Sequence, residues 1–194
     1  MVRAAWFAIA FAVQPLAAAE GGVGPDRTAE IDRFFKLVQT VQFEAVRAAL
    51  ETDPSLATAR DRFEFTALHM LDVEFSRAIF DLLRARGADV NAANDEGITP
   101  LHIVRDPAAV PALVEAGANV EARDDGDRTP LHTAVMEPDS EQVIAALLAV
   151  GADPNALDGH GASPILLATE VGDIEYVRLL RQAGARPHRE GSND

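Results

Sequence analysis

The sequence predicts an all-α solenoid in which helix–turn–helix units stack in a row and finger loops project from one side. Three observations predict this fold class: a helix-start motif repeats along the chain, a glycine motif repeats beside it, and each expected second helix carries one apolar stripe. A unit with one apolar stripe cannot bury its own core, so the units must stack. The four helix-start motifs are Thr66-Ala67-Leu68-His69, Thr99-Pro100-Leu101-His102, Thr129-Pro130-Leu131-His132 and Ser163-Pro164-Ile165-Leu166.

Each helix-start motif predicts the first helix of a unit. A Thr or Ser hydroxyl can accept from the free N–H groups of a first turn, and the Pro after it has the φ that this position needs. The motifs lie 33, 30 and 34 residues apart, and the residues missing from the second unit fall between Thr99 and Asp106. We expect the first helix there to lose nearly one turn. Either this creates a notch lined by Ile103, Arg105 and Asp106 that receives a partner loop, or it is tolerated drift in a repeat array.

The glycine motif predicts where the second helix of each unit ends. A Gly after the last turn can adopt the left-handed conformation that closes a helix, and a Ser or Asp is favoured at the N-terminus. Apolar residues three apart, such as Phe80 and Leu83, give each second helix its stripe. The terminating glycines are Gly87, Gly117, Gly151 and Gly184, and the predicted N-caps, eleven residues earlier, are Ser76, Asp106, Ser140 and Asp173.

Both motifs resemble the ankyrin repeat, whose signature is a T-P-L-H-x-A helix start followed by a G-A-D-V-N finger. The resemblance covers residues 61–188 and is specific. It implies that the signature histidines hydrogen-bond to the backbone of neighbouring fingers; these are His69, His102 and His132. The sequence departs from the signature at Ala67 in place of Pro, at Leu166 in place of His, and at Asp127 in place of the turn Gly.

Residues 1–19 are predicted to be a secretory signal peptide that is cleaved before Glu20. A cationic start at Arg3, an apolar stretch and a run of small residues are typical of such a signal. The apolar stretch would form only ~15 Å of helix, too short for a hydrocarbon core of ~30 Å, so no stable membrane anchor is expected after cleavage. Of the 17 basic residues all but one are Arg, which favours a GC-rich bacterial genome and the periplasm of a Gram-negative bacterium.

The remaining chain divides into segments set by the two motifs. A degenerate N-terminal capping repeat is expected from its apolar stripes, followed by four repeats of which the second is shortened. The predicted segments are a flexible N-terminus at 20–27, the capping repeat at 28–60, repeats at 61–93, 94–123 and 124–157, a last repeat with C-terminal cap at 158–188, and a polar tail at 189–194.

Composition and spacing exclude several classes of function. With 31 acidic and 17 basic residues the net charge is -14, which does not suit a nucleic-acid backbone or an anionic membrane. The absence of Cys excludes disulfides, thiolate zinc sites and Fe–S clusters. Repeats stack ~8–10 Å apart, so the signature histidines cannot share a zinc ion whose ligands lie within ~2.1 Å. The acidic run at 124–127 lacks the spacing of a calcium loop and predicts a solvated turn.

No catalytic, metal or cofactor site is therefore expected, and the protein is expected to be a monomer and not an enzyme. The resemblance to ankyrin repeats implies protein binding through the finger tips and the concave face of the first helices. Acidic tips would steer a basic partner. The predicted partner-binding residues are Phe63, Phe65, Asp95, Glu96, Ile98, Arg105, Asp106, Asp125, Asp127, Arg128, Met136, Glu137 and His160.

Three hypotheses of function follow. The leading one is a protein that inhibits or protects an envelope or delivered enzyme, as immunity proteins do. The second is a periplasmic scaffold or stress-related accessory protein with several weak partners, and a remote third is a small-molecule binder or an enzyme. Phe63 and Phe65 are either interface anchors at a solvated turn or residues buried against the N-terminal unit.

Overall fold

The computed structural model describes residues 26–72 and 74–186, and within these ranges it confirms the predicted all-α solenoid. An isolated bridge between Arg60 and Thr66 is the only extended pairing in the described ranges. The helices are α1 (Arg27–Gln39), α2 (Phe43–Thr52), η1 (Pro54–Thr58), η2 (His69–Leu71), α3 (Arg77–Arg84), α4 (Pro100–Ile103), α5 (Ala109–Glu115), α6 (Pro130–Met136), α7 (Glu141–Ala149), α8 (Pro164–Val171) and α9 (Ile174–Gln182).

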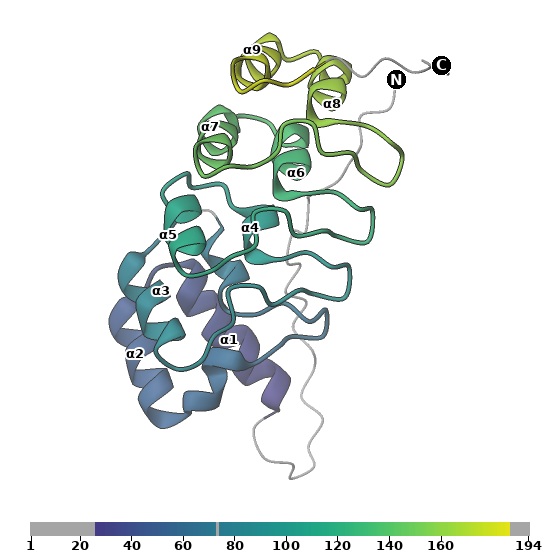
Figure 1. Cartoon of the computed structure of the whole chain (residues 1–194). Helices are drawn as coiled ribbons and strands as arrows, with labels where there is room; N and C mark the ends of the chain where they lie inside the picture. The colour runs from purple at the N-terminus through teal and green to yellow at the C-terminus, as the bar shows by residue number, and fades with distance from the viewer. Residues whose placement is uncertain (1–25, 73, 187–194) are drawn as a thin grey trace.

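The helices form two columns, and the finger loops all project from the same side of the stack (Figure 1). The inner column, next to the fingers, contains α1, η2, α4, α6 and α8, and the outer column contains α2, α3, α5, α7 and α9. Most helices pack on their neighbour in the same column, as α4 does on α6 and α7 does on α9. The contacts therefore run from unit to unit, as the single apolar stripes predict.

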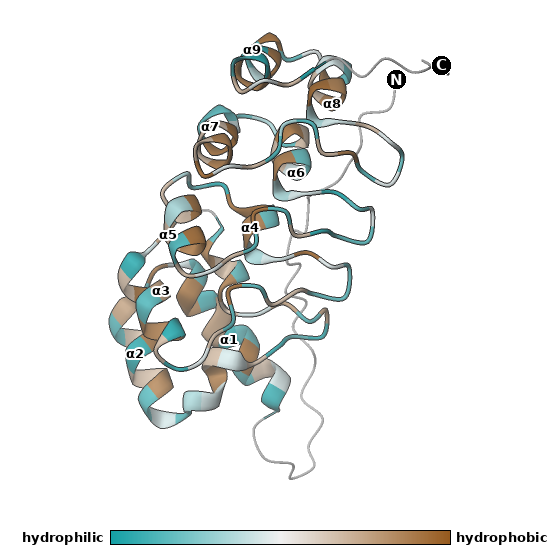
Figure 2. Cartoon of the chain, viewed as in Figure 1, coloured by the Kyte–Doolittle hydropathy of each residue, from teal (hydrophilic) through white to brown (hydrophobic). Residues whose placement is uncertain are grey.

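The core lies between the two columns, where the apolar faces of the helices meet, while the fingers are largely hydrophilic (Figure 2). Phe34, Phe80 and Tyr176 are among its largest fully buried side chains. Burial of one large apolar side chain contributes about 1.5–3 kcal/mol, so the stack is stabilised along its whole length. In the N-terminal unit α1 contributes Phe34 and Phe35 to this core and α2 contributes Leu50.

Each second helix from α3 to α9 ends in a left-handed glycine. The four glycines have φ between 90° and 97°, a conformation that costs other residues steric energy. The residue after each glycine donates its N–H to the carbonyl five residues back, as Ala88 does to Leu83 at 3.1 Å. This bond satisfies a carbonyl that the end of the helix leaves open. The glycines are Gly87, Gly117, Gly151 and Gly184.

The expected N-caps of the second helices are only partly realised. Ser76 and Asp173 accept from backbone N–H groups at the starts of α3 and α9. Ser140 precedes α7, but its hydroxyl donates to the carbonyls of Ala134 and Glu137 and does not cap the helix. The hydroxyl does not cap α7 because it bonds to these two carbonyls at the end of α6.

Asp106 is not the N-cap of α5, because that helix begins only at Ala109. The Asp106 carboxylate instead accepts from the N–H groups of Phe75 at 3.0 Å and Ala108 at 2.9 Å. The late start places Pro111 in the first turn, where its missing N–H removes no helical hydrogen bond. The α5 helix therefore accommodates Pro111 by starting later than the sequence predicts.

The first helices differ in length. The first repeat has only the 3₁₀ turn η2 after Thr66, where the motif predicts an α-helix, because Ala67 does not fix φ as Pro does at this position. In the second repeat α4 is four residues long, in agreement with the expected loss of a turn. The chain after α4 then crosses to the first repeat, where the N–H groups of Arg105 and Asp106 donate to the carbonyl of Asp72 at 2.7 and 3.2 Å.

The predicted signal peptide, its cleavage point before Glu20 and the polar tail at 189–194 lie outside the described residues. Among the described residues, the helices are all too short or too polar to cross a bilayer.

We predict that residues 99–117 exchange their amide hydrogens faster than residues 129–151. The helix α4 is a single turn, and a cavity of about 10 Å³ lies beside it between Leu71, Phe75 and Val104. Regions with short helices and incomplete packing open at lower free energy. Hydrogen exchange with mass spectrometry measures the difference, and equal protection of the two segments would contradict the prediction.

Candidate functional site

The four fingers share one turn built on an Asp or Asn. In the third finger, the side chain of Asp124 accepts from the N–H groups of Gly126 at 2.9 Å and Arg128 at 2.8 Å. The other fingers repeat these bonds two and four residues after their own Asp or Asn. The sequence reading missed these residues, although each lies five residues before its helix-start Thr or Ser. The fingers are residues 61–65, 94–98, 124–128 and 158–162, and the turn residues are Asp61, Asn94, Asp124 and Asp158.

This turn corrects the prediction that residues 124–127 are a solvated acidic run. Asp124 is only 5% exposed, and besides its two backbone bonds it pairs with the guanidinium of Arg128 at 2.8 Å. Buried carboxylates are retained where such donors replace water. Asp125 and Asp127 remain exposed. The acidic charge of this finger therefore lies on its tip and not in the residue that shapes the turn.

A buried histidine connects each of the first three repeats to the next finger. In the second repeat Nδ1 of His102 accepts from the N–H of Thr99 at 3.1 Å and lies 2.8 Å from the Thr99 hydroxyl. Because Nδ1 accepts, the proton is assigned to Nε2, which donates to the carbonyl of Arg128 at 3.1 Å. His69 and His132 make the same bonds, to the carbonyls of Ile98 and Ala162.

The last repeat has no such connection, because Leu166 stands where the signature has His. Leu166 is 38% exposed, and the hydroxyl of Ser163 is buried with no hydrogen-bond partner among the described residues. The histidine normally uses this hydroxyl, so the substitution leaves it unsatisfied. The connected array thus ends at the fourth finger.

A groove of about 860 Å³ lies between the fingers and the first helices. It extends from the first finger to the start of α7 and therefore spans three repeats. It contains nine of the thirteen predicted partner-binding residues, whereas Asp106, Asp125, Asp127 and His160 lie outside it. The nine are Phe63, Phe65, Asp95, Glu96, Ile98, Arg105, Arg128, Met136 and Glu137.

The unequal lengths of α4 and α6 produce a step in the groove. The helix α4 ends at Ile103, whereas α6 continues three residues further, to Met136. At 1.5 Å per residue the difference is about 4.5 Å. Ile103 and Val104 line the low side of the step, and Met136, Glu137 and Pro138 line the high side.

The two phenylalanines of the first finger have different environments. Phe63 is 43% exposed and stacks under the guanidinium of Arg62 at 4.8 Å. Phe65 is half-buried and packs edge-on against the imidazole of His69, with ring centroids 5.2 Å apart. Phe63 is therefore the more accessible of the two rings to a partner.

Two predicted partner-binding residues have mainly structural roles. Ile98 is 7% exposed rather than an exposed tip residue, because the turn of its finger directs its side chain inward and its carbonyl accepts from His69. Asp106 holds the backbone of Phe75 and Ala108, as described above. Its carboxylate is thus occupied by intramolecular bonds.

The groove carries an excess of negative charge. Its arginines are both paired within the chain, Arg105 with Glu137 at 3.2 Å and Arg128 with Asp124 at 2.8 Å. The carboxylates of Asp95, Glu96 and Asp139 are exposed, and none forms an ion pair with a described residue. Such a lining attracts cations, because a concave surface concentrates the field of its charges.

The loop of residues 137–140, which follows α6 and borders the groove, is fixed by the last repeat. The hydroxyl of Tyr176 donates to the carbonyl of Glu137 at 2.9 Å and accepts from the N–H of Ser140 at 2.9 Å. Between these two residues Asp139 adopts a left-handed conformation with φ of 56°. The sequence places an extra residue of the third repeat within Met136–Asp139, beside the predicted notch, but it does not predict the role of Tyr176, because contacts across 36 residues have no local sequence signal.

No group of three or more His, Asp or Glu side chains that could hold a metal ion occurs among residues 26–72 and 74–186. Both ring nitrogens of His69, His102 and His132 form hydrogen bonds within their own repeat and with the next finger. What the groove offers is a combination of open apolar surface and unpaired carboxylates.

Comparison with known proteins agrees with this geometry. A family model described as "Ankyrin repeats (3 copies)" matches residues 70–158 and 105–191. Among curated proteins, the chain is 30% identical over 151 residues to "Intracellular phospholipase A2" of Caenorhabditis elegans. The match covers 72% of this chain but only 14% of that protein, so it does not indicate phospholipase activity for this chain.

We predict that the protein loses stability as the pH falls from 7 to 5. Burial lowers the pKa of His69 to about 4, and it also lowers the pKa of His102 and His132. A folded pKa below the unfolded value of about 6.5 means that the unfolded chain binds the proton first, so stability falls once the pH drops below about 6.5. His69 alone accounts for about 2 kcal/mol of this loss.

Urea unfolding at pH 7 and pH 5 measures the effect. His69→Gln should be less stable at pH 7 but should show a smaller loss between the two pH values. His160→Gln is the matched control, since His160 lies exposed on the fourth finger and contacts no other repeat through its ring in the described structure. An unchanged pH dependence in His69→Gln would show that the assignment is wrong.

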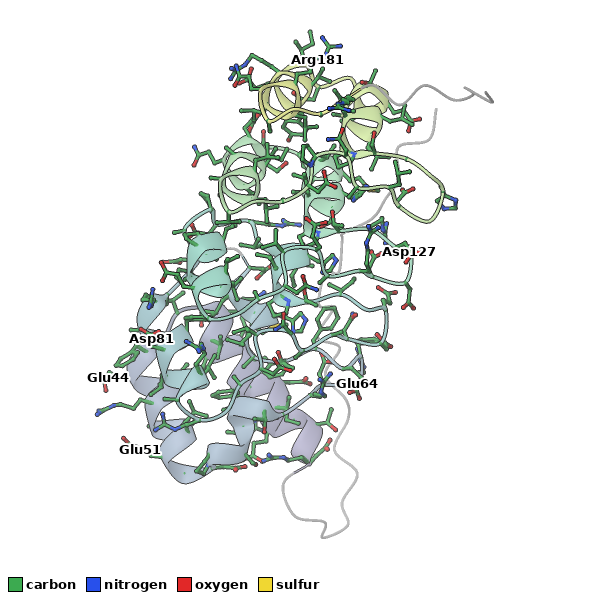
Figure 3. All side chains as sticks on the ribbon, viewed as in Figure 1. Glu44, Glu51, Glu64, Asp81, Asp127 and Arg181 are labelled. Carbon is green, nitrogen blue, oxygen red and sulfur yellow. The ribbon has the colours of Figure 1, made fainter. Side chains whose placement is uncertain are left out.

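We predict that Asp127→Gly stabilises the protein by about 0.5–1 kcal/mol. Asp127 has φ of 55° at the turn position that Gly97 and Gly161 occupy in the second and fourth fingers, and it projects from the finger side of the stack (Figure 3). Glycine adopts this conformation without steric cost. Asp125→Gly removes the same charge without relieving a positive φ, so it should give no gain; equal gains in urea unfolding would refute the argument.

Proposed function

The chain belongs to the ankyrin repeat family, and we propose that it is an exported module that binds one partner protein in the groove between its fingers and its first helices. Ankyrin repeats are a non-catalytic fold for protein–protein interaction. The observation that carries the proposal is the groove itself, which brings nine of the predicted binding residues together on one face.

The exposed apolar side chains of the groove support binding of a protein. Phe63 is 43% exposed and Met136 is 39% exposed, although both residue types are usually buried. Aromatic residues and Met are enriched in protein interfaces, where a few such anchors supply most of the binding energy. These two side chains are the anchors that we expect a partner to cover.

The fingers are held in place before any partner arrives. Neighbouring fingers bond to each other through their backbones, as Asp125 does to the carbonyl of Glu96 at 3.0 Å and Gly159 to that of Gly126 at 2.9 Å. The histidine bonds hold the bases of the same fingers. A binding surface that is already ordered loses less conformational entropy on association, which favours a tight complex.

Export and a role at the cell envelope complete the proposal. The N-terminal residues have the cationic start, apolar stretch and small residues of a secretory signal, which supports export to the periplasm of a Gram-negative bacterium. A tight, stoichiometric complex there suits a protein that inhibits or protects an envelope or delivered enzyme. A periplasmic scaffold with several weak partners is the alternative outcome of the test below.

The full chain with a C-terminal tag, expressed in a Gram-negative host, tests both parts. N-terminal sequencing of the periplasmic protein should begin at Glu20, and recovery of the intact chain from the cytoplasm alone would exclude export. The purified protein is then used to capture partners from envelope extract, and mass spectrometry identifies them. We expect one partner with a dissociation constant well below 1 μM.

Two matched double variants show whether capture depends on the groove. Phe63→Ala with Met136→Ala removes the two anchors and should weaken binding at least about tenfold. Leu166→Ala with Ile174→Ala removes exposed apolar side chains outside the groove, 38% and 85% exposed, and should leave binding unchanged. Several weak partners would favour the scaffold, and equal capture by both variants would contradict the groove as the site.

A further inference from the structure

The charges that line the groove are not balanced by the chain itself. Arg105 and Arg128 are its cationic residues, and each is paired with a carboxylate of the groove, Glu137 and Asp124 respectively. Three further exposed carboxylates, those of Asp95, Glu96 and Asp139, have no cationic partner among the described residues. A partner that brought carboxylates to this surface would meet repulsion, whereas one that brought Lys or Arg would complete three ion pairs.

Part of the apolar lining of the groove lies at the step between α4 and α6. Ile103 and Val104 on the low side and Met136 on the high side are separated by the height of about three helical residues, about 4.5 Å. This height matches a single large side chain and not a packed helix face. The carboxylates of Asp95 and Glu96 on the second finger and of Asp139 beyond α6 belong to residues that line the same groove.

We infer that the occupant of the groove is a cationic segment of a partner protein, with one large apolar side chain placed at the step and Lys or Arg side chains paired with Asp95, Glu96 and Asp139. This inference rests on the proposed function and adds the chemistry of the partner to it. The groove crosses three repeats, about 20 Å, which corresponds to about six extended or thirteen helical residues. A short segment thus fills it.

A phage library of random 16-residue peptides, selected on the full-length protein, tests this chemistry. We expect the enriched peptides to combine at least three Lys or Arg residues with one Leu, Ile, Met, Phe or Trp. Fluorescence anisotropy of an enriched peptide should show weaker binding when the salt concentration is raised from 50 to 300 mM, because the contacts are between charges in a groove open to solvent.

Two triple variants with equal changes of charge separate the groove from the overall charge of the protein. Asp95→Asn, Glu96→Gln and Asp139→Asn should weaken binding about tenfold or more, and Asn also tolerates the positive φ at position 139. The control neutralises Asp32, Glu51 and Glu170, three exposed carboxylates outside the groove, and should change binding less than twofold. Glu51 lies on the side of the stack away from the fingers (Figure 3).

Other outcomes overturn the inference. Enriched peptides that are neutral or acidic, yet lose binding in the Phe63→Ala, Met136→Ala variant, would show that the groove binds proteins of a different chemistry; the proposed function would then stand. Basic peptides that bind both triple variants equally would show only attraction to the overall negative charge. A selection that yields no groove-dependent peptide would also reject a short cationic segment, and the capture experiment would decide the proposed function independently.

Discussion

The hydrogen bond from a buried imidazole to the next finger is the contact on which the rest of this structure depends. Each histidine is fixed on one side by the Thr that starts its own helix and on the other by a carbonyl of the following finger. Both ring nitrogens are used, so the finger can occupy only one position relative to the helix. Where Leu166 replaces this histidine, the chain of connections ends and the Ser163 hydroxyl is left buried without a partner in the described structure.

The groove follows from these fixed fingers together with first helices of unequal length. Regular repeats would line a concave face of even depth, but here η2 and α4 are single turns while α6 and α8 are longer. The step at Ile103 and Met136 is therefore a product of shortening in one repeat and normal length in the next. Tyr176 adds a further constraint, since a residue of the last repeat fixes the loop that borders the groove.

Several parts of the site could be predicted from local sequence and others could not. The exposed acids Asp95 and Glu96 and the side chain of Met136 occupy fixed places in the repeat, so the resemblance predicted finger-tip and concave-face positions for them, and all three line the groove. Ile98 was predicted to be exposed because it lies in a finger. The conformation of the finger turn instead directs its side chain inward. The role of Tyr176 could not be predicted because it depends on contacts with residues 36 and 39 positions away in the chain.

The sequence by itself determined the all-α solenoid, the number of repeat motifs, the terminating glycines and the short α4, because periodicity, helix caps and glycine conformations are local properties of the chain. It could not distinguish a notch at α4 from harmless drift. The tertiary structure shows that Ile103 and Arg105 line a groove and that Asp106 lies outside it, since the lining of a groove depends on how neighbouring helices and fingers stack. It also decided which carboxylates are paired and which are open, because ion pairs such as Arg105 with Glu137 join residues from different repeats.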